Sequence, residues 1–359
     1  MSPLDRNDRK TPVAAFLLRA ALFASPLLLV LGAYLVLDPF RVLREYDDPS
    51  RGSTVDLNKD HVGTRAYLRR HEMERYDAFL FGSSRSLGFR IEDWSRHLPP
   101  GSVPFAFDAN QESLYGIGRK VRLIDSLGGP LRYALIIVDP LNTFAPWGNS
   151  EGHLFMKDPV LSGESTWTFQ KTFVRAWFSR HFFVKYLDHR ITGARRAYMN
   201  GALVFDGRNR YDPVSMERLM PVEAVIQADP DRYYREHAGL FPARDTSAQQ
   251  YYPAMLGPDH RRGLEDIAAI MHKHGTRADV IVAPLYDQRA IAPEDLEQLR
   301  EVFGAAHTYD RSGINTITRD VRNYIESSHF RAHVGRQLMD EVYGPALPPV
   351  REGDPGPPR

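Results

Sequence analysis

The 359-residue chain contains no cysteine. It therefore forms no disulfide, offers no thiolate nucleophile and has no zinc site of the cysteine type. A domain of this size can bury a large core without disulfides, so their absence does not fix the cellular compartment.

A surplus of charge of either sign is also lacking, because 46 Lys and Arg face 45 Asp and Glu. No basic field indicates a nucleic acid partner, and no acidic surplus indicates disorder. We expect no metal and no cofactor. His272 and His274 come at the end of an expected helix, where cationic side chains suit the helix dipole, and we interpret them as solvated.

A long apolar run occurs near the N-terminus, from Ala20 to Leu37, after a basic segment that includes Lys10 and Arg19. As a helix this run spans about 27 Å, close to the hydrocarbon thickness of a bilayer. A cleaved signal peptide is the alternative, but its apolar region is usually about 7–15 residues long and ends at a small-x-small site, which is not evident here. We predict an uncleaved transmembrane helix over residues 13–38, in contact with the bilayer. The positive-inside rule then leaves residues 1–12 in the cytoplasm.

The rest of the chain predicts an α/β domain. Residues 39–75 form a polar connector with a helix over 61–75. The Pro-rich tail 345–359 has little to bury, so we expect it to be disordered. Short apolar runs bounded by Gly, Pro or Asp predict five buried parallel strands: Ala78–Phe81, Val103–Phe107, Tyr133–Val138, Ala278–Ala283 and His307–Asp310. Helical patterns accompany them: Leu114–Leu127, Ala254–His274, Pro293–Phe303 and Val334–Tyr343. This alternation predicts a doubly wound sheet within residues 76–344.

A long insertion, residues 143–253, separates the third and fourth strands. Its aromatic residues recur at spacings near three and four, which predicts one amphipathic helix from Thr166 to Asp188. Such a helix can simply cover the core. Alternatively it acts as a lid or lies on a membrane surface, because basic residues accompany the aromatics: Arg175, Arg180, Lys185 and Arg190. We expect an insertion of this length to form a cap over the site.

The first predicted strand leads directly into Gly82, Ser83 and Ser84. A strand followed by a tight glycine turn places a hydroxyl at the carboxyl edge of the sheet, where open α/β folds bind their ligands. The turn also opens a helix, whose free N–H groups can stabilise an oxyanion. Serine is a favoured helix cap as well, and such loops also bind phosphate, so a structural or phosphate-binding role remains open.

A carboxylate and a histidine stand near the other end of the chain, at Glu326 and His329. A serine becomes a nucleophile when a base takes its proton, and the base needs a third group to fix its tautomer. Ser84 as nucleophile, His329 as general base and Glu326 as its orienting carboxylate meet that need. The alternative is that this segment only caps the last helix.

These two segments resemble motifs of the SGNH/GDSL hydrolase superfamily. The stretch 81–86, Phe-Gly-Ser-Ser-Arg-Ser, resembles the first block, with Ser84 at the nucleophile position and Ser83 where aspartate is usual. Glu326-Ser-Ser-His329 resembles the last block, Asp-x-x-His, with glutamate in place of aspartate. The resemblance covers residues 77–344 except the insertion. It implies a flavodoxin-like, three-layer domain with a five-stranded parallel sheet.

The resemblance is weaker at the oxyanion hole. The region that matches the second block, residues 107–113, has no glycine, so Asn110 is the candidate there. Asn142, after the third strand, is the candidate for the third block. Ser83, Arg85 and Asp139 lie beside these positions and are further candidates for oxyanion or substrate binding. Loss of one oxyanion donor typically costs about 10²–10³ in rate.

Within the superfamily, the chain is similar to membrane-anchored proteins of alginate O-acetylation and D-alanyl transfer. That likeness implies a single-pass protein of the bacterial inner membrane with an extracytoplasmic, periplasmic domain. It implies acyl transfer to a cell-envelope polysaccharide, a glycan acceptor and a multi-span membrane O-acyltransferase as partner. An esterase that only hydrolyses, and a non-catalytic scaffold that binds polymer or partner, are the alternatives.

Overall fold

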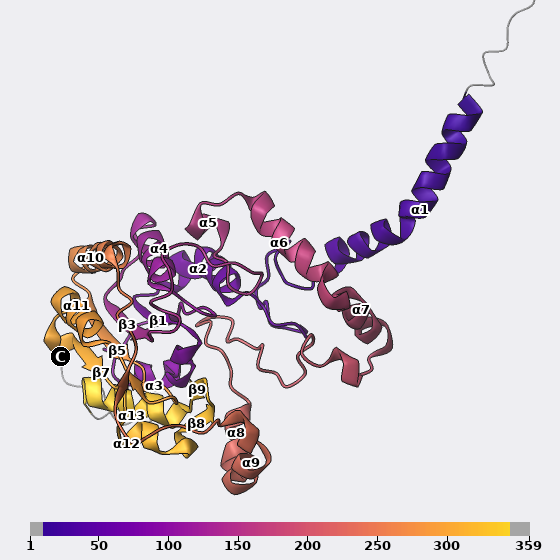
Figure 1. Cartoon of the computed structure of the whole chain (residues 1–359). Coiled ribbons are helices and arrows are strands. Elements are labelled where there is room, and N and C mark those ends of the chain that lie inside the picture. Colours follow the sequence, from indigo (N-terminus) through magenta and orange to yellow (C-terminus); the bar gives the residue numbers. More distant parts are fainter. Residues whose placement is uncertain (1–9, 345–359) are drawn as a thin grey trace, which may run out of the picture.

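The structure is a computed structural model that describes residues 10–344 (Figure 1). Helix α1 (Lys10–Leu37) projects from the domain and is bent along its length in Figure 1. It contains Pro26, and proline is a common cause of helix kinks. Val13–Leu37 is long and apolar enough to cross a membrane. Most of the predicted cytoplasmic segment 1–12 and the tail 345–359 lie outside the described residues.

Five parallel strands form the central sheet in the order β2-β1-β3-β5-β7. Each short apolar run predicted from the sequence is one of these strands, with ends that agree to within one residue. Their bounds are β1 (Ala78–Gly82), β2 (Pro104–Ala106), β3 (Tyr133–Val138), β5 (Arg277–Val282) and β7 (Thr308–Asp310). The prediction of a five-stranded parallel sheet in an α/β domain is therefore confirmed.

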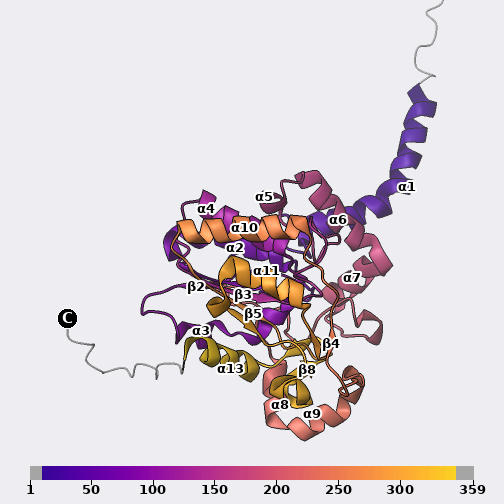
Figure 2. The ribbon, with the colours of Figure 1, turned by 60° about the vertical axis from the view of Figure 1, so that its left-hand side comes forward.

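Helices cover both faces of this sheet, as Figure 2 shows. Phe79 and Phe81 of β1 point to the face packed by α2 (Lys59–Glu74), α4 (Leu114–Ser126), α10 (Pro258–Lys273) and α11 (Pro293–Phe303). Ala78 and Leu80 point to the opposite face, which is packed by α3 (Ile91–Ser95), α12 (Thr316–Arg319) and α13 (Ala332–Tyr343). Both faces of β1 and β3 are buried, which explains why these strands lack a polar alternation.

The helix predicted over 254–274 begins only at Pro258. The N–H groups of Met255 and Leu256 donate to the Asp295 carboxylate, at 2.8 and 3.0 Å, so these two residues run in a non-helical conformation. Pro258 then opens α10, as proline often does at the first helical position.

The single helix predicted over Thr166–Asp188 is wrong. Two helices, α6 (Thr166–Phe178) and α7 (Phe182–Thr192), are separated by a break at which Arg180 and His181 have φ of 46° and 55°. The break turns the chain so that α7 residues pack against Trp177 of α6, with Phe182 at 5.9 Å and Tyr186 at 5.7 Å between ring centroids. Helical periodicity alone does not reveal such a turn.

The remaining elements are short. The insertion also holds α5 (Pro159–Ser162), α8 (Val222–Ala228), α9 (Pro230–Glu236) and β4 (Gln250–Tyr251). Strand β4 pairs in parallel with β6 (Arg289–Ala290), and β8 (Tyr324–Glu326) forms an antiparallel hairpin with β9 (His329–Phe330).

A close backbone contact joins the segment after β1 to the end of the chain. A 3₁₀ helix, η1 (Ser84–Gly88), packs against β9 and α13. A Cβ added to Gly335 would lie 2.0 Å from the carbonyl oxygen of Gly88, and one added to Gly88 would lie 2.4 Å from the Phe330 ring. The absence of side chains at both glycines lets α13 approach η1.

Replacing Gly335 by alanine tests this contact. The new methyl group would meet backbone, which cannot rotate away, so we expect a loss of about 1–3 kcal/mol in the free energy of unfolding. Urea unfolding of the full chain measures the loss. Gly239→Ala is the control, since a Cβ added there would have no atom within 4 Å and no strained φ is present. Equal midpoints for the two variants would contradict the expectation.

Candidate active site

The sharp turn after β1 depends on Gly82. A Cβ at this position would lie 2.9 Å from the Ile137 carbonyl oxygen on β3 and 3.2 Å from Cβ of Ser86. Glycine therefore lets the chain leave the sheet and start η1 at Ser84, which is partly buried. The helix expected to open here is a five-residue 3₁₀ helix, so it offers little helix dipole.

Ser83 and Asn142 are held by Asp139, which follows β3 directly. The Ser83 hydroxyl donates to Asp139 Oδ2 at 2.7 Å and accepts from the N–H of Arg85 at 3.2 Å. Asp139 Oδ1 accepts from both the backbone N–H and the side-chain amide of Asn142, at 2.9 and 3.0 Å. Three of the predicted site residues thus form one network that fixes the carboxyl ends of β1 and β3.

Glu326 and His329 face each other across the β8–β9 hairpin. The Nδ1 atom of His329 is hydrogen-bonded to Glu326 Oε1, and Glu326 Oε2 accepts from the N–H of Ser328 at 2.6 Å. Nε2 of His329 is buried and has no hydrogen-bond partner among the described residues. This leaves the second ring nitrogen free to act on another group.

The Glu326 carboxylate is stabilised in its charged form. Burial alone would raise its pKa, but the hydrogen bond and charge of His329, the Ser328 N–H and the charge of Arg85 together lower the pKa below its ordinary value. Arg85 is itself nearly buried. A charged carboxylate orients the imidazole and stabilises an imidazolium.

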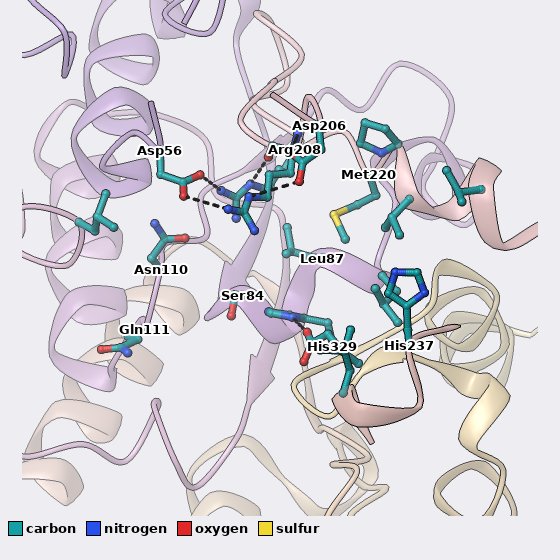
Figure 3. A pocket seen from close by; sticks show the side chains of 18 of the residues that line it. Asp56, Ser84, Leu87, Asn110, Gln111, Asp206, Arg208, Met220, His237 and His329 are labelled. Carbon is teal, nitrogen blue, oxygen red and sulfur yellow. Dashed lines mark hydrogen bonds and ion pairs between the residues drawn. The ribbon is translucent and has the colours of Figure 1, made fainter. Parts of the chain in front are cut away.

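Ser84, Glu326 and His329 line one cavity of about 770 Å³. In Figure 3 the His329 side chain extends toward Ser84. Within residues 10–344 no hydrogen bond joins these two side chains. Catalytic hydrogen bonds often tighten only when substrate binds, so the shared cavity is the more informative observation.

Asn110 and Gln111 also line this cavity, whereas Asn142, Ser83, Arg85 and Asp139 are not among its lining residues. Gln111 has φ of 50°, the left-handed conformation that glycine adopts without strain. Within the described part of the chain, the N–H groups of Asn110 and Gln111 donate no hydrogen bond. The loop thus presents free donors without the glycine that is usual in the second block of the superfamily.

The insertion provides most of the cavity wall, namely twelve of its twenty lining residues. It also holds the hairpin of His329. Tyr233 on α9 donates to the carbonyl of Ile325 at 2.8 Å, and Glu223 on α8 pairs with Arg331 at 3.1 Å. The insertion, which was expected to form a cap, is therefore packed directly against the hairpin that contains His329.

The sequence did not reveal a group of ion-paired residues that lines the cavity opposite His329. Asp56, from the connector, lies 3.7 Å from Arg218 and 3.8 Å from Arg208, both from the insertion (Figure 3). These residues are far apart in the sequence and form no motif, so only the fold brings them together.

A buried ionic cluster behind the 107–113 loop was also missed. Lys59 pairs with Asp108 at 3.0 Å, and Lys120 lies 3.2 Å from Asp60 while donating to the carbonyl of Phe107 at 3.0 Å. The remaining members are Glu112 and Lys157. Burial lowers the pKa of Lys59, whereas the charges of Glu112 and Asp60 overcome burial and raise the pKa of Lys157. The cluster fixes the start of the loop that carries Asn110. Lys59 donates to the carbonyl of Ala106 at the end of β2, and Lys120 donates to the carbonyl of Phe107 at the start of the loop.

The lowered pKa of Glu326 predicts a pH-dependent contribution to stability. A carboxylate with a depressed folded-state pKa stabilises the fold above its unfolded pKa, and the effect is lost as the pH falls through the folded pKa. We expect Glu326→Gln to be less stable than the wild type at pH 7. The difference should shrink once the pH falls below the unfolded glutamate pKa of about 4.3 and be lost below the folded-state pKa. Urea unfolding across this pH range, with the exposed Glu294→Gln as control, measures it. A difference that persists unchanged at pH 3 would contradict the pairing.

Neither the protein-family models nor the curated proteins identify a relative of this chain. No protein-family model matches it, and no curated protein matches it significantly. Since a fold alone does not define an activity, function has to be inferred from the geometry of the site.

Proposed function

We propose that the protein is a membrane-anchored serine acyltransferase or esterase of the SGNH type, acting on acyl groups, in particular O-acetyl groups, of an exported or cell-envelope polysaccharide. The observation that carries the proposal is the Glu326–His329 pair: His329 lines the same cavity as Ser84, and its Nε2 has no hydrogen-bond partner within residues 10–344. The strand order β2-β1-β3-β5-β7 supports the flavodoxin-like part of the proposal.

In the first half-reaction, Ser84 Oγ attacks the carbonyl carbon of the donor ester while His329 Nε2 takes the hydroxyl proton. The tetrahedral oxyanion collapses, the ester C–O bond breaks, and the imidazolium returns the proton to the departing alcohol. The acyl group remains on Ser84. Glu326 stays charged and holds the imidazole in the tautomer with the proton on Nδ1.

In the second half-reaction, a sugar hydroxyl or water gives its proton to His329 and attacks the acyl carbon. Ser84 leaves and regains a proton from His329. Transfer and hydrolysis share the acyl-serine and differ only in the acceptor. The open cavity of about 770 Å³ is large enough to admit a glycan acceptor.

As donors to the oxyanion we assign the side-chain amide of Asn110 and the backbone N–H of Gln111, in place of Asn142. Asn110 and Gln111 line the cavity, whereas the Asn142 amide is occupied by Asp139. The buried ionic cluster holds this loop, so its donors do not need to reorganise during the reaction.

The membrane anchor is part of the same proposal. Tyr34 of α1 is buried against the domain, and the indole of Trp177 donates to the carbonyl of Val30 at 3.1 Å. Cleavage after α1 would remove this packing, which favours an uncleaved helix. A bacterial inner-membrane location, an extracytoplasmic domain and a multi-span O-acyltransferase partner remain proposals from the resemblance.

A non-catalytic scaffold is the second candidate. The absence of a hydrogen bond between Ser84 and His329 among the described residues, and of a glycine in residues 107–113, favours it. Such a scaffold would bind polymer or partner in the cavity and form no covalent intermediate.

Intact-mass analysis with an activated acetyl ester separates the two candidates. We expect the full-length protein to gain one acetyl group or to turn over the ester, and Ser84→Ala and His329→Ala to lose at least about 10³-fold in rate. The exposed Ser126→Ala controls for non-specific acylation and keeps full activity. A folded wild type without adduct or turnover would contradict the enzyme and favour the scaffold.

Replacing Asn110 by alanine tests the oxyanion assignment. Loss of one donor to the developing charge should lower kcat about 10²–10³-fold and leave KM nearly unchanged. Steady-state kinetics with the same ester measure both constants. A change in KM alone would show that Asn110 contacts the ground-state substrate and does not stabilise the transition state.

A further inference from the structure

We propose that helices α6 and α7 lie on the surface of the bilayer that α1 crosses and bind its anionic lipids. The proposal relies on α1 being a membrane span and is independent of catalysis. The surface is defined by the exposed residues of α6, α7 and the segment that follows, within 166–196.

The position of these helices follows from their contacts with α1. Tyr34 of α1 packs against Trp177 at 5.9 Å between centroids, and the Trp177 indole binds the carbonyl of Val30. Figures 1 and 2 show α6 and α7 beside the end of α1 that enters the domain. In the same part of α1, next to Tyr34, the side chains of Leu35 and Val36 are 52% and 67% exposed. If lipid covers these two apolar side chains, α6 and α7 lie at the depth of the adjoining headgroups.

Positive charge is concentrated in the segment that carries this surface. Residues 166–196 contain seven Lys and Arg and one acidic residue, Asp188, a net charge of 7 − 1 = +6. The whole chain carries +1, so the other residues sum to 1 − 6 = −5. A basic segment next to a membrane span is attracted to anionic lipid headgroups.

The side chains are arranged as an interfacial helix requires. On α6, Phe169, Phe173 and Trp177 form the buried stripe. A second stripe, Trp167, Lys171 and Arg175, also has the four-residue spacing of one helix face, and all three of its members are exposed.

Exposed apolar residues accompany the charges. Trp167 is 76% exposed, and on α7 Val184 and Ile191 are 44% and 81% exposed and stand seven residues apart. Tryptophan is enriched at membrane–water interfaces, and basic side chains there reach headgroups while their stems contact apolar surface. An anionic bilayer therefore suits both kinds of side chain on this surface.

The test uses the full-length protein in nanodiscs. Incorporation into the discs shows separately that α1 inserts into the bilayer. Discs of phosphatidylcholine with bromine-labelled chains should quench the emission of Trp167, which is isolated by subtracting the spectrum of Trp167→Phe. The other tryptophans, Trp94, Trp147 and Trp177, contribute equally to both spectra. Quenching of Trp167 by aqueous iodide, and none by brominated lipid, would overturn the proposal.

Lipid charge is tested by amide hydrogen exchange over residues 166–192. We expect exchange to slow severalfold in discs containing phosphatidylglycerol relative to phosphatidylcholine alone, and Lys171→Gln/Arg175→Gln to abolish this slowing. Arg132→Gln/Arg262→Gln removes two exposed cations elsewhere and should retain it. Equal amide exchange of the wild type in both kinds of disc would contradict the binding of anionic lipids. The surface would then be expected to bind another protein.

Discussion

The contact between the backbones of Gly88 and Gly335 is the constraint on which the site depends. Ser84 and His329 are 329 − 84 = 245 positions apart, and nothing local in the sequence relates them. Because a Cβ at Gly335 would overlap the Gly88 carbonyl, α13 can approach η1 only through glycine. The β8–β9 hairpin precedes α13 directly, so the same approach brings the imidazole to the cavity that contains Ser84.

The insertion is part of the core architecture and more than a detachable cap. Lys157 pairs with Glu112 and Asp60 in the buried cluster behind the 107–113 loop, and Tyr233 holds the hairpin of His329. Removing one partner of a buried ion pair is strongly destabilising, because the other charge is left unpaired. The insertion therefore stabilises the candidate oxyanion loop and the candidate base at the same time.

The sheet could be predicted because its strands are continuous apolar runs with clear boundaries, and burial on both faces requires such runs. The break between α6 and α7 could not, since it depends on packing around Trp177 and α1. The buried ionic cluster could not be predicted either. In the sequence Asp60 and Lys120 look like ordinary surface charges, and only the fold brings them together as a buried ion pair. Ser84, Glu326 and His329 were predicted by motif and share a cavity, and their catalytic roles remain predictions.

The most direct test of the account is to locate the adduct of a serine-directed fluorophosphonate on the full-length protein by peptide mapping. A reagent of this kind modifies a serine that an adjacent base activates. The account predicts modification of Ser84 alone, lost when His329 is replaced by alanine in a protein that remains folded. Modification of another serine, or none under conditions where a known serine hydrolase reacts, would contradict the assignment of Ser84 as nucleophile.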